Sequence, residues 1–314
     1  MTTHNNPDSR RLTSRARISP SVPDVSGELR RLMLRDRWLV NLLHEHQVLT
    51  TEHVAALGFD NVHTARNRLG QLASRGVLAR FRDCVRPGSQ QMRWTLGWIG
   101  AAYIAARDGA PTPRPATIAE RVNRLSANPR LAHLLGVNGF FVSLAAHARH
   151  TPGTRLDVWW SERRCREVTG ELARPDGHGT WTEDGHTVAW WLEYDRATEP
   201  SRRLAEKLDG YAALHQATGL DHAVLIRMQT PRQETELHRR LRTHPAITSG
   251  RLLVATMSGN HTTHPVAPVW LPVGQTARVR LAHLPNAAGA YPSDATHHRP
   301  TRQLPDPHQP RWNR

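Results

Sequence analysis

The chain of 314 residues is short of lysine, of cysteine and of long apolar runs. Lys207 is its only lysine among 42 basic Lys and Arg residues, so the other 41 are arginines. Its two cysteines, Cys84 and Cys165, lie far apart and predict neither a disulfide framework nor a cysteine-based zinc site. Because no run of 18 apolar residues occurs and residues 1–27 lack the apolar core of a secretory signal, we expect no membrane-spanning segment and a cytoplasmic location.

Positive charge is what the chain has in excess. Its 42 basic residues against 27 acidic ones give a formal net charge of +15 with histidine neutral. Such a surplus suits a polyanionic partner, most simply nucleic acid. Polar tails at 1–27 and 285–314, which we expect to be disordered, and a proline-rich linker at 108–117 leave two predicted domains, 28–107 and 118–284.

Hydrophobic periodicity predicts three helices followed by a hairpin in the first domain. The helices are expected at 34–46, 52–57 and 62–74, and the strands at 77–82 and 90–96. Thr50 or Thr51 is the expected N-cap of the second helix, and Asp60 or Asn61 that of the third. On the third helix, spacings of 3, 4 and 3 predict one buried face made of Val62, Ala65, Leu69 and Leu72. This order of elements is typical of a winged helix-turn-helix domain.

Side chains suited to DNA lie on the other face of that third helix and on the hairpin. The helix presents His63, Arg66, Asn67 and Gln71, whose donors and acceptors match base edges in the major groove. The hairpin carries Arg80, Arg82, Arg86 and Arg93, which we expect to lie against phosphates. We therefore predict double-stranded DNA as a partner. The alternative is a winged helix used for protein contacts, with the arginines as a solvated face.

The second domain is predicted to alternate strands with helices. Helices are expected at 131–147, 201–218 and 231–243, strands at 155–160, 169–174, 186–195, 222–228 and 251–257, and a loop at 178–185. The order is α-β-β-β-α-β-α-β, an α/β domain. With the first domain it gives an α+β chain overall.

Three acidic residues are expected to meet at the ends of neighbouring strands. Asp176 follows one predicted strand, while Glu193 and Asp195 share a face at the end of the next. Because three carboxylates repel one another, a hard divalent cation is their natural partner, and all three are candidate metal ligands. The alternative is that Pro175-Asp176-Gly177 is only a turn and that the other two acids mark an exposed edge.

Lys207 is the candidate organic cation of this site. It lies on the inward stripe of the predicted helix 201–218, which also holds Leu204, Leu208, Tyr211 and His215. An ammonium can lose its proton or orient a water molecule, which a guanidinium does not easily do. Asp176, Glu193 and Lys207 are therefore the candidate catalytic residues. The alternative is a buried ion-pair network without chemistry.

Pro175-Asp176, followed by Glu193 after a 16-residue gap, resembles the motif of the PD-(D/E)xK nuclease superfamily. The resemblance implies that Asp176 and Glu193 hold magnesium and that a lysine assists the attacking water. Asp195 stands where that lysine is usual, two residues after the glutamate. Lys207, on the following helix, is the residue that could supply the amine, as in some members of the superfamily.

A broader resemblance runs from about residue 34 to residue 257. The predicted winged helix, the segment Arg174–Gly177, the segment Leu192–Glu199, and then Lys207 and Tyr211 resemble the replication-relaxation family. This implies a DNA-binding protein acting with plasmid replication or mobilisation proteins of a plasmid or integrative element, with Arg196 as a phosphate contact. Magnesium-dependent DNA nicking is the enzymatic form of this hypothesis. The other form is a non-enzymatic accessory factor or transcriptional repressor with a degenerate nuclease-like scaffold.

Overall fold

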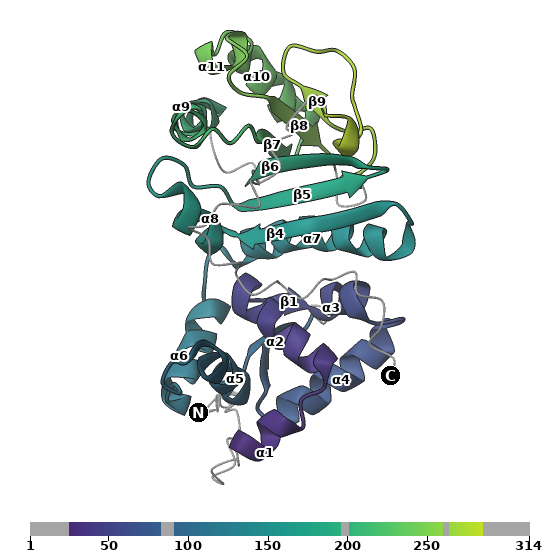
Figure 1. Ribbon diagram of the computed structural model, residues 1–314, viewed down its shortest axis with the longest axis vertical. Coiled ribbons are helices and arrows are strands. Elements are labelled where there is room, and N and C mark those ends of the chain that lie inside the picture. Colours follow the sequence, from purple (N-terminus) through teal and green to yellow (C-terminus); the bar gives the residue numbers. More distant parts are fainter. Residues whose placement is uncertain (1–24, 83–90, 196–200, 260–263, 285–314) are drawn as a thin grey trace, which may run out of the picture.

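The computed structural model describes residues 25–82, 91–195, 201–259 and 264–284. Within these ranges it contains eleven α-helices and two β-sheets, so the expected α+β class is confirmed (Figure 1). The tail expected at 285–314 lies outside the described residues. The tail expected at 1–27 also lies outside them, except for its last three residues, which begin helix α1 (Val25–Arg30).

The first part of the chain is a set of helices beside a small antiparallel sheet. Its elements are α2 (Leu34–His46), β1 (Leu49–Thr50), α3 (Thr51–Gly58), α4 (Val62–Ser74), β2 (Leu78–Phe81) and β3 (Arg93–Leu96). The strands lie in the order β1-β3-β2. Helices α5 (Trp98–Asp108) and α6 (Pro115–Ser126) follow, so the predicted linker 108–117 is helical at both ends. Pro115 is tolerated at the start of α6 because the first helical N–H has no intrahelical acceptor to lose.

Side-chain caps fix where α3 and α4 begin. Thr50 Oγ1 accepts a hydrogen bond from the His53 N–H at 3.1 Å, and Asn61 Oδ1 accepts one from the Thr64 N–H at 2.9 Å. The predicted buried face of α4 is confirmed for Ala65, Leu69 and Leu72. It is wrong for Val62, which is 37% exposed because the first turn of α4 lies at the surface.

The second part is a six-stranded mixed sheet with helices on both faces. Its helices are α7 (Leu131–His150), α8 (Glu162–Thr169), α9 (Ser201–Thr218), α10 (Pro231–Leu241), α11 (Pro245–Thr248) and the 3-10 turn η1 (Leu281–His283). Its strands are β4 (Thr154–Ser161), β5 (Gly177–Glu183), β6 (His186–Tyr194), β7 (Ala223–Met228), β8 (Val254–Ser258) and β9 (Leu271–Pro272), in spatial order β4 to β9. The pairs β4–β5, β5–β6 and β8–β9 are antiparallel, and β6–β7 and β7–β8 are parallel.

The prediction for residues 169–185 is wrong. The expected strand 169–174 is replaced by the end of α8 and a turn at Gly170, and the expected loop 178–185 is mostly strand β5. Gly177 and Gly179 lie in this strand, where the lack of a Cβ leaves room for the Phe141 and Trp190 rings. A Cβ on Gly179 would come within 2.4 Å of the Trp190 ring. Asp176 therefore precedes a strand instead of following one.

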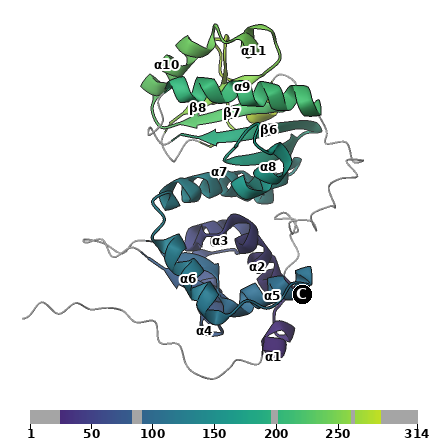
Figure 2. The same ribbon diagram turned by 90° about the vertical axis from the view of Figure 1, so that its left-hand side faces the viewer.

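Helix α7 lies between the sheet and the first part of the chain (Figure 2). One apolar cluster runs from α2, α3 and α4 through α7 to the inner face of the sheet, and a second lies between the outer face and helices α8, α9 and α10. By length and composition alone α7 could cross a membrane, contrary to the expectation from the sequence, but a core helix of a folded protein meets the same criterion. Its apolar surface is explained by packing on two sides.

A buried amide ties α7 to the first part of the chain. The Asn138 side chain, 2% exposed, donates to the carbonyl oxygens of His46 at 3.0 Å and Val48 at 2.7 Å. His46 ends α2 and Val48 follows it, so neither carbonyl has a further helical turn to bond; the His46 carbonyl also accepts the Val48 N–H at 2.7 Å. The His46 ring stacks on Trp159 of β4 with 3.8 Å between centroids. The contact between the two parts is therefore both apolar and hydrogen-bonded.

Replacing Asn138 with alanine is expected to destabilise the chain by about 2 kcal/mol, because two buried carbonyl groups lose a donor. The free energy of unfolding in urea measures this. Asn123→Ala, on an exposed position of α6, is the matched control and is expected to change stability by less than about 0.5 kcal/mol. Equal stabilities of the two variants would contradict the role given to Asn138.

Candidate functional site

Asp176 and Glu193 lie next to each other at the edge where β5 begins and β6 ends. The Asp176 N–H donates to the Leu192 carbonyl at 2.9 Å, one step beyond the Gly177–Leu192 pair. Asp176 Oδ2 in turn accepts the Tyr194 N–H at 2.8 Å. Asp176 is thus held by the backbone on either side of Glu193, through its N–H at Leu192 and through its carboxylate at Tyr194.

Helix α9 supplies the partners of Glu193. The carboxylate is 3% exposed; its Oε2 accepts from Lys207 Nζ at 2.7 Å and its Oε1 from the Tyr211 hydroxyl at 2.6 Å. Leu204 and Leu208 of the predicted stripe are buried beside them. Lys207 is less buried than expected: its side chain is 37% exposed, so the ammonium is accessible from the surface while paired with a buried acid.

Burial and repulsion dominate the electrostatics of Glu193. Desolvation is the largest cause that raises its pKa, and the Asp176 charge raises it further, while Lys207 and Tyr211 act in the opposite direction. The result is a pKa of about 7. Burial, followed by the Glu193 charge, raises the pKa of the Tyr211 hydroxyl well above its ordinary value. The site is therefore short of positive charge even with Lys207 in place.

Two residues that the sequence did not single out complete the surroundings of Asp176. His133, in the first turn of α7, donates from Nε2 to Asp176 Oδ1 at 2.8 Å. Arg130, just before that helix, lies 3.7 Å from the same oxygen, and its side chain is 61% exposed. Both precede Asp176 by more than 40 positions, and no spacing pattern links them to it. Only the packing of α7 against the sheet brings them together.

The three-acid metal set expected from the sequence is not assembled. Within the described ranges, no three His, Cys, Asp or Glu side chains form a group that could hold a metal ion. β6 ends at Tyr194, so the strand alternation that would place Asp195 on the face of Glu193 no longer applies. Asp195 instead lines a separate cavity with Tyr194 and Arg227.

Asp176 and Glu193 by themselves still fit a magnesium ion. Mg²⁺ is commonly bound by only one or two protein carboxylates, with water and substrate phosphate oxygens as the other ligands. Each oxygen of these two carboxylates accepts a hydrogen bond from one protein group and keeps a further lone pair. A divalent cation would also relieve the repulsion that raises the pKa of Glu193.

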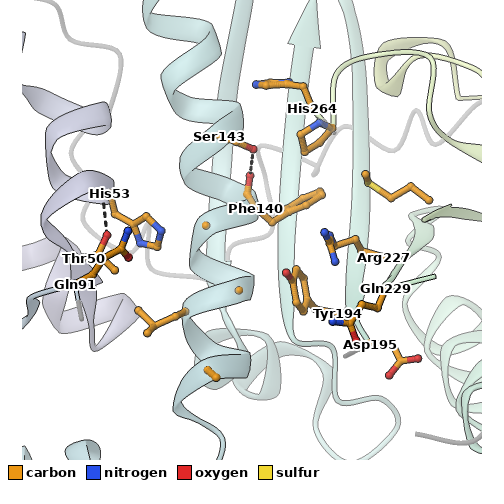
Figure 3. A pocket seen from close by; sticks show the side chains of 16 residues that line it. Thr50, His53, Gln91, Phe140, Ser143, Tyr194, Asp195, Arg227, Gln229 and His264 are labelled. Atoms are coloured by element: carbon orange, nitrogen blue, oxygen red, sulfur yellow. Dashed lines mark hydrogen bonds between the residues drawn. The ribbon is translucent and has the colours of Figure 1, made fainter. Parts of the chain in front are cut away.

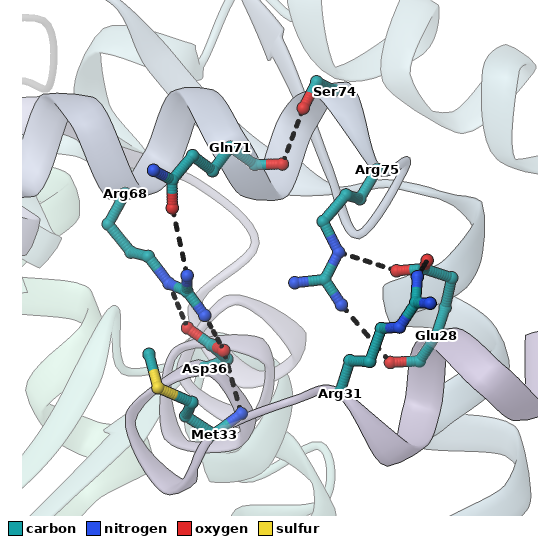
Figure 4. A network of polar contacts seen from close by, with 8 residues as sticks. All are labelled: Glu28, Arg31, Met33, Asp36, Arg68, Gln71, Ser74 and Arg75. Atoms are coloured by element: carbon teal, nitrogen blue, oxygen red, sulfur yellow. Dashed lines mark hydrogen bonds and ion pairs between the residues drawn. The ribbon is translucent and has the colours of Figure 1, made fainter.

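The predicted DNA-facing residues of α4 are all exposed. His63, Arg66, Asn67 and Gln71 share this surface. Two of them bond each other, since Asn67 Nδ2 donates to His63 Nε2 at 3.0 Å. Gln71 Oε1 accepts from Arg68 at 3.0 Å, and Arg68 is itself paired with the buried Asp36 (Figure 4). Among the described residues, Arg66 has no hydrogen-bond partner and presents its guanidinium to solvent.

The hairpin arginines are only partly described. Arg80 and Arg82, in and after β2, are exposed, and Arg93, which begins β3, is half-buried. Arg86 and Arg196 lie outside the described residues.

Comparison with known proteins gives one match. A model of the replication-relaxation family matches residues 40–225, which run from α2 into β7 and include Asp176, Glu193 and Lys207. No curated protein and no solved structure matches the chain.

The raised pKa of Glu193 predicts how stability depends on pH. A folded-state pKa of about 7, above the ordinary 4.5, means that the folded chain holds this proton more tightly than the unfolded chain. The associated stability is fully present below about pH 4.5 and is lost as the pH rises through about 7. Glu193→Gln stays neutral at all these pH values. Its free energy of unfolding, relative to that of the wild type, should therefore rise by up to about 3 kcal/mol between about pH 5 and about pH 8.5.

Urea unfolding at the two pH values, in the presence of a chelator, measures this difference. Glu120→Gln, at an exposed position of α6, is the matched control and should show no such change. A stability difference between wild type and Glu193→Gln that is the same at both pH values would show that Glu193 ionises normally.

Proposed function

This chain belongs to the replication-relaxation family, and from that membership and the geometry of the site we propose that it binds double-stranded DNA and nicks it with magnesium. The setting would be the replication or mobilisation of a plasmid or integrative element. The single observation that carries the nuclease proposal is the contact of the only lysine, Lys207, with Glu193 at 2.7 Å beside Asp176.

The first part of the chain supports DNA binding. Three helices followed by a β2–β3 hairpin, with β1 added to the sheet, follow the order of a winged helix-turn-helix. In that fold α4 enters the major groove, where Arg66 and Asn67 meet base edges, while Arg80 and Arg82 meet phosphates. The net charge of +15 favours such a partner.

The second part supports a PD-(D/E)xK-like centre in which Asp176 and Glu193 would hold magnesium. When bound, the ion would polarise the scissile phosphate and lower the pKa of a water molecule. Lys207 Nζ favours the ionised form of Glu193 and adds a positive charge beside the phosphate. Tyr211 and His133 fix the orientations of the two carboxylates. Arg130, exposed at the rim, is a candidate phosphate contact.

Magnesium-dependent nicking of supercoiled plasmid is the direct test. We expect wild type to convert supercoiled to open-circular DNA, and Asp176→Ala and Lys207→Ala to lose at least about 100-fold of that rate, since each removes charge at the reacting phosphate. Asp221→Ala, on an exposed loop before β7, is the matched control and should nick like wild type. Equal nicking by all four proteins would mean that the cleavage comes from elsewhere.

The non-enzymatic alternative makes a different prediction for the same proteins. If the second part is only a scaffold, no variant nicks, magnesium does not raise the melting temperature of wild type, and Lys207→Ala is destabilised because it leaves Glu193 without its cation. The chain would then be an accessory factor or repressor that binds DNA without cutting it.

DNA binding is tested by the salt dependence of the affinity and by a substitution on α4. Neutralisation of several phosphates predicts that affinity falls steeply between low and physiological salt. Arg66→Ala should weaken binding by about tenfold, because Arg66 is exposed on the expected groove face. Arg232→Ala, exposed on α10 at the opposite end of the molecule, is the control (Figure 1). A flat salt response, or equal losses in both variants, would contradict the assignment of α4.

A further inference from the structure

A cavity of about 530 Å³ lies along α7, away from the Glu193–Lys207 pair. Thr50 and His53 line it from the first part of the chain, and Asp195, Arg227 and Gln229 line it from the ends of β6 and β7 (Figure 3). The carboxyl ends of adjacent parallel strands are a common place for ligands in sheets of this kind. The site differs from the candidate nuclease centre, because neither Glu193 nor Lys207 lines it.

The sequence of α7 creates this space. The helix face toward the cavity carries Ala132, Gly136, Gly139 and Ser143, at helical spacings, where larger side chains would fill it. At Gly139 even a Cβ would lie 3.3 Å from His53 Nε2, and at Gly136 it would lie 2.6 Å from the Tyr194 ring. Elsewhere α7 carries large residues, including Phe141 and Leu144, that pack into the core.

The lining mixes polar and apolar groups, and the charges of Asp195 and Arg227 are of opposite sign. Asp195 and Arg227 are 5% and 7% exposed and bring one negative and one positive charge. Burial lowers the pKa of His53 to about 4, so this ring is neutral at pH 7, and burial also lowers the pKa of His264. A multiply charged phosphate group would find no surplus of positive charge here. Two amides, Gln91 and Gln229, add both donors and acceptors.

We propose that this cavity binds a nucleoside through its base. An uncharged base presents adjacent donors and acceptors on one edge, which match amide and carboxylate groups such as those of Gln229 and Asp195. Apolar contacts come from Leu135, Phe140 and Met257. The volume lies in the range of small-molecule sites, about 300–1,000 Å³. The base belongs either to a free nucleoside or to a strand of bound DNA.

A base in this cavity would contact β6, the strand that carries Glu193. The Tyr194 ring forms part of the wall, with Arg227 over it at 4.9 Å, while the Tyr194 N–H donates to Asp176. The inference does not depend on nicking, since it rests on the cavity and its lining alone.

Titration of the full chain with adenosine, guanosine, cytidine and thymidine, in a chelator so that magnesium plays no part, tests the proposal. Ligand-observed NMR or calorimetry should give saturable binding by at least one nucleoside, with a Kd on the order of 100 µM. Ser143→Leu, which fills the cavity, should weaken it at least tenfold. Gln229→Ala, at the exposed rim, should weaken it about fivefold without disturbing the fold, and Gln216→Ala, exposed on α9, should not change it.

A competition experiment distinguishes a free nucleoside from a base of a DNA strand. If a short single-stranded oligonucleotide displaces the nucleoside and loses affinity in Gln229→Ala, the cavity takes a base of the strand; if it does not displace it, the cavity takes a free nucleoside. Absence of saturable binding by all four nucleosides, or binding that Gln229→Ala and a folded Ser143→Leu leave unchanged, would overturn the proposal. Neither result bears on whether the chain nicks DNA.

Discussion

The burial of α7 on two sides is the constraint on which the rest of the structure depends. Its apolar residues join the core of the first part to the inner face of the sheet, so a single cluster spans both. In such a position a polar side chain is tolerated only when it is hydrogen-bonded, and the Asn138 amide meets this condition through the carbonyl groups of His46 and Val48, at and just after the end of α2. The candidate DNA-facing helix and the candidate acids are therefore connected through one packed helix.

The lysine at position 207 is explained by the burial of its partner, Glu193. Glu193 has two oxygens within the core, and Tyr211 takes one of them. A single ammonium can satisfy the other while the rest of its stem runs toward solvent, whereas the five donors of a guanidinium would need further partners on an apolar face. In a chain with 41 arginines, the one lysine stands where a compact cation is required. The raised pKa of Glu193 shows that this cation does not fully compensate burial and the charge of Asp176.

Hydrophobic periodicity correctly predicted helices whose apolar spacing can be read within the segment itself. Helices 34–46, 62–74 and 201–218 were found at those bounds, and the stripe that places Lys207 beside Glu193 came from helical spacing alone. Strand β5 was missed because its glycines are required by the Trp190 and Phe141 rings, a tertiary cause that no local pattern shows. Asp195 was misplaced because the strand ends one residue earlier, and His133 was not found because its partner lies 43 positions away.

Helix α7 contacts the candidate acids, the cavity and the first part of the chain through different residues. His133 bonds Asp176 near its start, the glycines at 136 and 139 open the cavity, and Asn138 between them bonds the first part of the chain. Because interiors are close-packed, a change at any of these positions displaces atoms at the other two. Substitutions at these positions of α7 therefore do not separate DNA binding, chemistry and ligand binding, whereas Arg66, Lys207 and Gln229, which come from α4, α9 and the end of β7, do.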